Sequence, residues 1–345
     1  MVPEWAPNLH PMLVHFPIAL LVVAVLVDAA SLVWRKHLAA TAIILYVLGA
    51  LGTVASYLSG KAAADTVLVS GQANVVLTAH ADWAAVALWF FVVYVLLRLV
   101  LIRLSQRAAM HIPLILVAVA GLFVLFKTAD NGGRMVYEHG VGVKAVDEMA
   151  STLETAQRDL ALMQGQHERP VAEEDGSWLW VPGPHAKEAF EHFTLLAGKL
   201  SVTAFKDTAA ALVADSVPAL FILEQDIASV QIDLDLDLGA FDGALQVVYN
   251  VQDPLNYYYT EFAEGHVRQG YMEHGVSHLM DDQPFVPAGW SRYRIVSDQG
   301  HFRVYAGGEV IAHGHSAAPG AGHVGLRISG DGTILLGRLA VLSLR

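Results

Sequence analysis

The stretch His10-Pro-Met-Leu-Val-His-Phe-Pro-Ile-Ala-Leu20 places two imidazoles at the mouth of an apolar run that is long enough to cross a membrane. A hydrocarbon layer about 30 Å thick needs roughly 20 apolar helical residues. The chain has four such runs up to residue 128, the last of them shorter: residues 12–33, 38–58, 83–102 and 112–126. The sequence therefore predicts four transmembrane helices.

Composition divides the chain into three parts. Residues 1–143 are predicted to form the transmembrane domain, residues 144–176 a connecting helix and a linker, and residues 177–345 a β domain. In the last part, eleven short runs alternate apolar and polar residues and are separated by Gly, Pro, Asn and Asp, which is typical of a sandwich or jelly roll. We expect a multi-domain chain in which an all-α transmembrane bundle precedes an all-β jelly-roll sandwich.

Basic residues predict the orientation of the helices. Five of them surround the first and third turns: Arg35, Lys36, Arg98, Arg103 and Arg107. The N-terminal segment has no Lys or Arg, and the second turn has only Lys61. Because Lys and Arg collect on the cytoplasmic side, we expect a bacterial inner-membrane protein whose termini and C-terminal domain are periplasmic.

Charge and cysteine content exclude several functions. Residues 1–130 carry a net charge of +2 and the remainder −14, within a total of −12. This acidic exported part argues against nucleic acid and is compatible with docking of a basic soluble protein. The chain has no cysteine, which excludes disulfides, c-type haem attachment and thiolate-held iron–sulfur clusters. Any redox centre must be held by histidine.

Four histidines are expected on the outer side of the bundle: His10, His15, His80 and His139. A haem in a helical bundle needs one or two imidazoles from facing helices, apolar walls and a cation near its propionates. His15 and His80 are the predicted ligands of a haem b iron, and Arg134 is the predicted propionate partner. His10 and His139 would hold a second centre or replace either ligand. The alternatives are interfacial histidines without a cofactor and a zinc or copper site.

Other residues of this half complete the prediction. The walls of the haem pocket are expected from Phe16, Trp83 and Tyr137. Gly132-Gly133 is expected to break the fourth helix at the outer surface. Asp28 is an acid within a membrane span, and we expect it to pair with Arg35 or with a buried polar group.

The N-terminal motifs resemble a known family. His-Pro-x-x-Val-His-Phe-Pro-Ile-Ala-Leu at residues 10–20, His80, and Gly-Gly-Arg-x-Val-Tyr-x-His-Gly-Val-Gly-Val at residues 132–143 are similar to the bacterial predicted membrane proteins of domain-of-unknown-function family 2231. The similarity covers about residues 8–145. It implies four helices and a b-type haem role in electron transfer, with the four outer histidines at the family's histidine positions.

The C-terminal half resembles concanavalin-like lectin and glucanase domains, most of all the branch described as keto-disaccharide hydrolase. The resemblance covers residues 177–345 and rests on the motifs at residues 242–250, 289–296, 304–311 and 322–327. It implies a sandwich fold. A glycosidase needs two carboxyl groups across a cleft, and the candidates Glu261, Glu264 and Glu273 have no diagnostic spacing, so we do not expect an enzyme.

Two further patterns in this half are candidate metal sites. Asp233, Asp235 and Asp237 alternate with apolar residues on one strand face, which predicts a solvated face or, alternatively, a calcium site. Chelating spacings also occur in the pairs His274 with His278 and His313 with His315.

Three functions are compatible with these patterns. The first, favoured by the histidines, is a membrane cytochrome that passes electrons to a periplasmic redox protein. The second is a haem-free accessory subunit that contacts other subunits of a respiratory or photosynthetic complex within the lipid bilayer. The third is a membrane-tethered module that binds carbohydrate.

Overall fold

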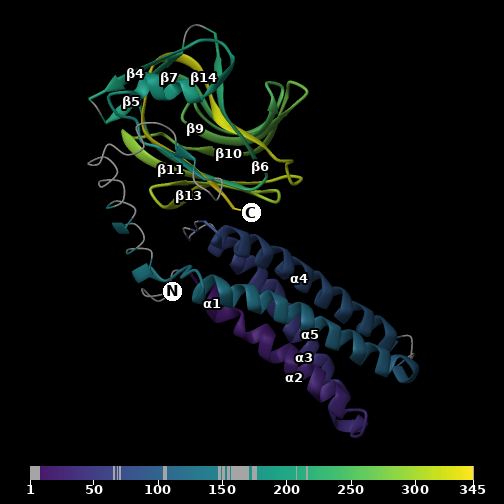
Figure 1. The fold of residues 1–345 in the computed structure, drawn as a ribbon. Coiled ribbons are helices and arrows are strands. Elements are labelled where there is room, and N and C mark those ends of the chain that lie inside the picture. Colours follow the sequence, from purple (N-terminus) through teal and green to yellow (C-terminus); the bar gives the residue numbers. More distant parts are fainter. Residues whose placement is uncertain are drawn as a thin grey trace. The chain divides into compact units, whose positions relative to one another are not determined.

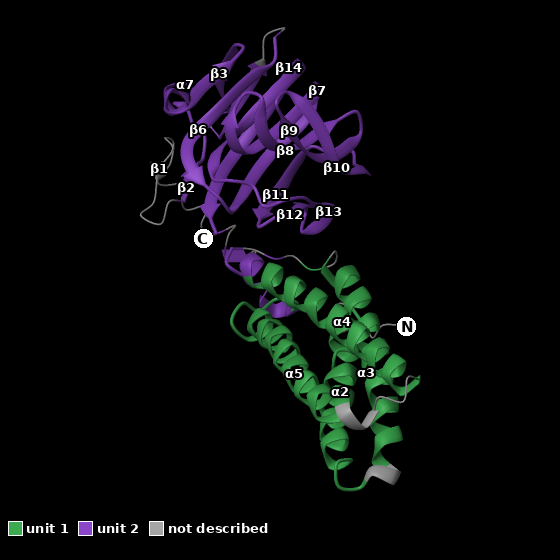
Figure 2. Ribbon diagram, turned by 90° about the vertical axis from the view of Figure 1, so that its right-hand side faces the viewer, with its two compact units in different colours: residues 1–67, 76–142 green, residues 68–75, 143–345 purple. Residues whose placement is uncertain are grey.

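The computed structural model describes residues 8–64, 67, 69, 71–103, 107–146, 149, 152–153, 156, 171–172, 177–206, 208–214 and 217–344. Two compact units are present, a bundle of residues 1–67 and 76–142 and a sandwich of residues 68–75 and 143–345 (Figure 2). Four apolar helices followed by an antiparallel β-sandwich confirm the predicted fold class. Most of the predicted connecting helix and linker, residues 144–176, lies outside the described residues.

The described residues of the bundle form five helical segments (Figure 1): α1 (His10–Leu13), α2 (His15–Ala30), α3 (Arg35–Ala64), α4 (Ala73–Arg103) and α5 (Arg107–Tyr137). Four stretches are long and apolar enough to cross a membrane: His10–Ala30, Leu38–Ala64, Ala73–Arg103 and Met110–Tyr137. Large apolar side chains such as Trp89 and Leu116 are more than half exposed, as expected of helices that face lipid. Leu21, Tyr46 and Phe91 are buried between the helices.

Local sequence sets the first and last helix ends. Pro17 has no amide hydrogen to donate to the carbonyl of Leu13, and its ring crowds that carbonyl, which explains why α1 and α2 are separated at Val14. The predicted break at Gly132-Gly133 is wrong, because α5 continues to Tyr137. A Cβ at Gly132 would lie 3.2 Å from His80 Cε1, so glycine at this position allows α5 to approach the imidazole.

The sandwich is built from fourteen strands among the described residues: β1 (Val171–Ala172), β2 (Trp178–Trp180), β3 (Thr194–Ala197), β4 (Leu200–Phe205), β5 (Ala209–Ala214), β6 (Ala219–Ile227), β7 (Val230–Asp253), β8 (Asn256–Ala263), β9 (His266–Glu273), β10 (Val276–Pro284), β11 (Trp290–Asp298), β12 (His301–Ala306), β13 (Glu309–His315) and β14 (Gly322–Ser343). The short helices α7 (Ala186–Ala189) and η1 (Phe190–His192) precede β3. All strand pairs among the described residues are antiparallel, in agreement with the period-two pattern of the sequence.

The two longest strands, β7 and β14, run through both layers. Their halves around residues 230–240 and 333–343 pair with β11 and β2, and their other halves pair with β8 and β6. Gly243 and Gly330 face each other where the strands cross from one layer to the other. A Cβ at Gly243 would lie 2.6 Å from Gly330 Cα, so this crossing needs glycine. Side chains from both layers meet in the core, where the rings of Phe262 and Tyr293 are 4.7 Å apart.

The predicted solvated face of β7 is wrong. Asp233 and Asp235 are only 4% and 5% exposed. The register places Arg294 and Arg292 of β11 directly opposite these two aspartates. Arg294 Nε lies 2.6 Å from Asp233 Oδ1, and Arg292 Nε lies 3.0 Å from Asp235 Oδ1. The carboxylates are therefore buried in ion pairs with the neighbouring strand.

Candidate functional site

The rings of His10 and His80 are in contact inside the bundle. Their centroids are 6.2 Å apart and their planes are nearly perpendicular. His10 Nδ1 lies 3.1 Å from Ser59 Oγ, and His80 Nδ1 lies 2.9 Å from the carbonyl oxygen of Thr128. Because a carbonyl oxygen only accepts hydrogen bonds, Nδ1 of His80 carries a proton. The two imidazoles thus connect α1, α3, α4 and α5.

The remaining predicted cofactor residues have other surroundings. His15 is exposed on α2, and His139 is half-buried after the C-terminal end of α5. Among the described residues, neither imidazole forms a hydrogen bond or a ring contact with His10 or His80. Arg134 is exposed, and its Nε lies 3.0 Å from a carboxylate oxygen of Glu138, one helical turn away.

Two glycines show how closely the helices approach the paired imidazoles. A Cβ at Gly60 would lie 3.0 Å from His10 Cε1, and one at Gly132 would lie 3.2 Å from His80 Cε1. The rings therefore fill the space between the helices. Phe16 and Tyr137, two of the three predicted pocket walls, are 62% and 91% exposed, so they do not form walls between the helices. The third, Trp83, is half-buried on α4.

A second polar cluster surrounds Asp28 toward the other end of α2. Asp28 is fully buried, and both of its carboxylate oxygens accept hydrogen bonds from the guanidinium of Arg98. His111 Nε2 lies 3.0 Å from Asp28 Oδ1, and Tyr46 donates to Oδ2 at 3.3 Å. Tyr94 accepts a hydrogen bond from Arg98 at 2.8 Å. This network joins α2, α3, α4 and α5 and leaves the buried charge fully paired, as a membrane interior requires.

The sandwich carries a row of polar side chains that crosses five strands. We name it the charged row: Arg327 on β14, Gln246 on β7, Glu261 on β8, Arg268 on β9 and Asp282 on β10. Each member is the direct cross-strand partner of the next. Neighbouring strands are about 4.8 Å apart, so the row places a polar group at regular intervals across the sheet.

Hydrogen bonds connect the charged row. Arg327 donates to Gln246 Oε1 at 3.3 Å, and Gln246 donates to Glu261 Oε2 at 2.7 Å. Arg268 donates to the other oxygen of Glu261 at 3.2 Å and lies 3.6 Å from Asp282. Exposed Glu264 also accepts from Arg268, at 3.0 Å. The side chains of Arg268, Glu261 and Asp282 keep exposed fractions of 25%, 16% and 36%, so a ligand can reach them.

The acidic residues around Arg268 affect the pKa of its guanidinium and restrict its orientation. Hydrogen bonds to Glu264 and Glu261 raise the pKa of Arg268 above its ordinary value, because they stabilise the charged form. Such charge-assisted bonds also fix the planar guanidinium in one orientation. The hydrogen-bond donors and acceptors of the row are therefore held in place before any ligand binds.

Two tyrosines of β8 lie beside the row, and both are nearly fully buried. Tyr257 donates to Gln246 Oε1 at 3.4 Å, and Tyr259 is 2.8 Å from Ser277 Oγ. Burial raises the pKa of both phenols, so both remain neutral hydrogen-bonding groups at physiological pH. A Cβ at Gly270 would lie 2.4 Å from the Tyr259 hydroxyl oxygen, so glycine at this position makes room for the phenol beside the row.

Sequence reasoning missed two of these arrangements. The sequence places Arg98 and His111 on the side opposite the four outer histidines and pairs neither with Asp28, although the depth of Asp28 indicates a basic partner on another helix. No short sequence motif indicates the charged row, because its members are far apart in the sequence and become neighbours only through the pairing of their strands. Glu261 and Glu264 were considered for catalysis, but the structure shows both of them bonded to Arg268.

Comparisons with known proteins agree with the division into two units. Residues 6–145 match the family described as "Predicted membrane protein (DUF2231)". The chain thus contains a predicted membrane protein domain with four candidate spans. This confirms the resemblance stated for the N-terminal half. No curated protein matches the chain.

Several solved structures are similar to the sandwich. They include carbohydrate-binding module CBM66 from Bacillus subtilis, with 14% identity, a TM-score of 0.39, and coverage of 44% of this chain and 96% of that one. A protein of unknown function with a galectin-like fold from Bacillus subtilis has 13% identity, a TM-score of 0.39, and coverage of 47% and 93%. A β-glucanase from Bacillus licheniformis has 9% identity, a TM-score of 0.37, and coverage of 50% and 100%. At these identities the comparison concerns the fold alone.

The interpretation of the chain as an electron-transferring b-type cytochrome is wrong. The matched family is described only as a predicted membrane protein and the similar structures are sandwiches, so neither finding points to haem or to electron transfer. The predicted iron ligands His15 and His80 also differ in their surroundings, since the ring of His80 contacts His10 and His15 is exposed. Binding of haem b stays a prediction of the sequence.

Proposed function

We propose that this protein is a membrane-anchored carbohydrate-binding protein. Its four helices anchor it in the bilayer, and its sandwich binds a saccharide through the charged row. The observation that carries the proposal is the continuous set of hydrogen bonds from Arg327 to Arg268, in which partly exposed charged side chains are joined through buried Gln246 on one sheet face.

The chemistry of the charged row suits a saccharide. Every sugar hydroxyl both donates and accepts hydrogen bonds, so a site for several hydroxyls needs alternating donors and acceptors. The row provides guanidinium, amide, carboxylate, guanidinium and carboxylate groups in that order. A few polar groups that are fixed in advance by their neighbours give orientation and specificity to a binding site. A patch of one charge would instead favour an ionic ligand.

The proposed location is the inner membrane of a bacterium, with the sandwich on the periplasmic side. Arg35, Lys36, Arg103 and Arg107 support this orientation through the excess of basic residues in two turns. Arg98 does not contribute, since it is buried in the ion pair with Asp28. The proposed partner is then an envelope saccharide rather than the redox protein that was expected with a cytochrome.

A glycan array tests the binding function with the full chain in lipid nanodiscs. Nanodiscs are needed because alkyl glycoside detergents carry sugar headgroups that would compete for the site. We expect binding to at least one class of neutral oligosaccharide. Replacing Glu261 by Gln or Arg268 by Lys should weaken that binding about tenfold, which is the effect of losing one hydrogen bond to a charged group.

The matched control is Glu309→Gln, which removes an exposed carboxylate from β13 in the other layer. This variant should bind as the unmodified protein does. Absence of binding to every oligosaccharide would overturn the proposal. Equal affinities for Glu261→Gln, Arg268→Lys and the control would show that the charged row is not the binding site.

A further inference from the structure

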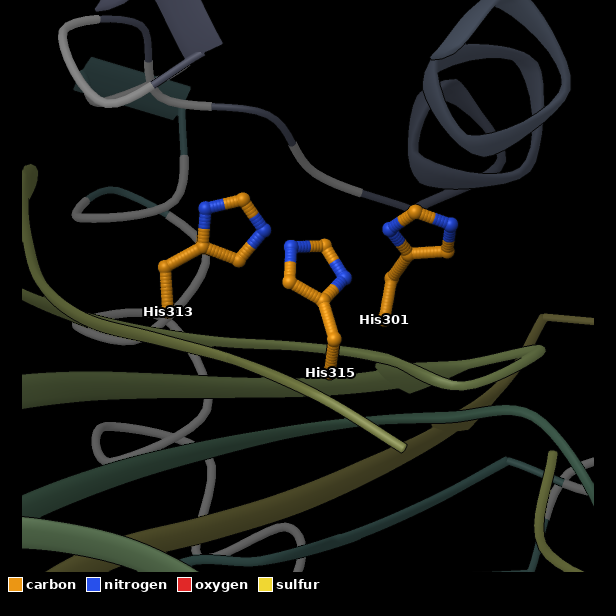
Figure 3. Close-up of side chains that lie close together, drawn as sticks. All are labelled: His301, His313 and His315. Carbon is orange, nitrogen blue, oxygen red and sulfur yellow. The ribbon is translucent and has the colours of Figure 1, made fainter. Parts of the chain in front are cut away.

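Three histidines meet on one face of the β12–β13 hairpin. His301 lies at the start of β12, and His313 and His315 lie at the end of β13. Figure 3 shows the three imidazole rings next to one another above the strands. From this geometry we propose that His301, His313 and His315 form a binding site for a divalent transition-metal ion, with Zn²⁺ as the ion that fits best.

The register of the hairpin creates the cluster. His301 is the direct cross-strand partner of His315. His313 and His315 are separated by one residue and therefore point to the same side of their strand. That side is opposite to Phe302, which is fully buried in the sandwich core. Three imidazoles from two strands thus share the strand face that points away from this core.

The distances suit coordination after small side-chain rotations. The ring centroids of His301 and His315 are 4.9 Å apart, and those of His313 and His315 are 4.6 Å apart. One nitrogen from each ring can be chosen so that all three lie within 4.8 Å of one another. Ligand nitrogens on a tetrahedral Zn²⁺, each about 2.0 Å from the ion, are about 3.3 Å apart. The required movement is therefore on the order of 1 Å, within the reach of imidazole side chains on a strand.

The donor set selects the kind of ion. Three neutral imidazoles suit Zn²⁺, Cu²⁺ or Ni²⁺, whereas Ca²⁺ and Mg²⁺ prefer oxygen ligands. A site with three histidines leaves the fourth tetrahedral position open to water or to another ligand. His315 is exposed and the other two are half-buried, so the ion can enter from solvent.

Charged residues around the cluster affect the affinity in opposite directions. Asp298 of β11 is the cross-strand partner of His301, and Asp281 accepts a hydrogen bond from the backbone amide of His313. Both carboxylates favour a cation. Arg303 is the cross-strand partner of His313, and its fixed positive charge opposes the ion. Among the described residues of the neighbouring strands, these two acids outnumber the one base, which favours a divalent cation.

Zinc binding tests the proposal directly. The full chain should be purified without a polyhistidine tag, stripped with a chelator and titrated with Zn²⁺ by calorimetry. We expect one tight equivalent per chain that competes with Co²⁺ and is unaffected by millimolar Ca²⁺. His315→Asn should weaken it by about 100-fold or more, since even partners of metal ligands contribute 10–100-fold. Co²⁺ should give the intense visible bands of a tetrahedral site.

The matched control is His192→Asn, which replaces an exposed histidine outside the cluster. It should leave the tight equivalent intact. The proposal is overturned if His315→Asn and the double variant His301→Asn/His315→Asn both retain that equivalent, or if the unmodified chain has none. Melting temperatures measured in chelator identify any variant that loses binding because it unfolds. His315→Asn is then decisive, because its side chain is exposed and contributes little to packing.

Discussion

Asp28 and Arg98 form a buried ion pair that we expect to stabilise the helix bundle. Both residues are less than 10% exposed, and their charges compensate each other on two different helices. Replacing Asp28 by Leu or Arg98 by Met leaves one charge buried without its partner. We expect each single variant to lose about 3–5 kcal/mol of stability, measured by unfolding of the purified protein in mixed micelles with increasing SDS.

The double variant Asp28→Leu/Arg98→Met separates the pair energy from other effects. Because both charges are then absent, it should be less destabilised than the sum of the singles by about 2 kcal/mol or more. Leu97→Met, on the exposed side of α4 next to Arg98, should be close to neutral. Additive losses in the cycle would contradict a direct coupling between the two residues.

At the level of elements, the stability of the bundle depends on how closely α4 and α5 pack. A Cβ at Gly121 of α5 would lie 2.3 Å from Phe90 Cε1 and 3.0 Å from Phe91 Cζ on α4. Gly121→Val should therefore separate the two helices and reduce stability by about 1–3 kcal/mol, the usual cost of overpacking. Ala120→Val adds a branched side chain at an exposed position of the same helix and serves as the control. Equal unfolding curves for the two variants would contradict this account.

The elements themselves were largely predictable, whereas the contacts between them were not. Runs of apolar residues identified all four spans, although α4 and α5 extend well beyond the predicted limits. The predicted C-terminal end of α5 is wrong because Gly132 allows close packing against His80 and does not end the helix. In the sandwich, alternation indicated the strands but not their register. The ion pair of Asp233 with Arg294 and the approach of His301 to His315 depend on that register, so the sequence alone could not reveal them.

At the level of the whole molecule, the topology follows from the proposed orientation: if the four candidate spans among the described residues all cross the membrane, residue 8 and the sandwich lie on the same side. The chain contains no cysteine, so a single introduced thiol reports its own side. Ser201→Cys lies exposed on β4, and Val33→Cys replaces a residue that is 75% exposed between α2 and α3. If the basic turns are cytoplasmic, a membrane-impermeant maleimide added to spheroplasts should label Ser201→Cys at once. Val33→Cys should react only after the membrane is permeabilised, and the reverse pattern would place the sandwich in the cytoplasm and remove envelope saccharides as its ligands.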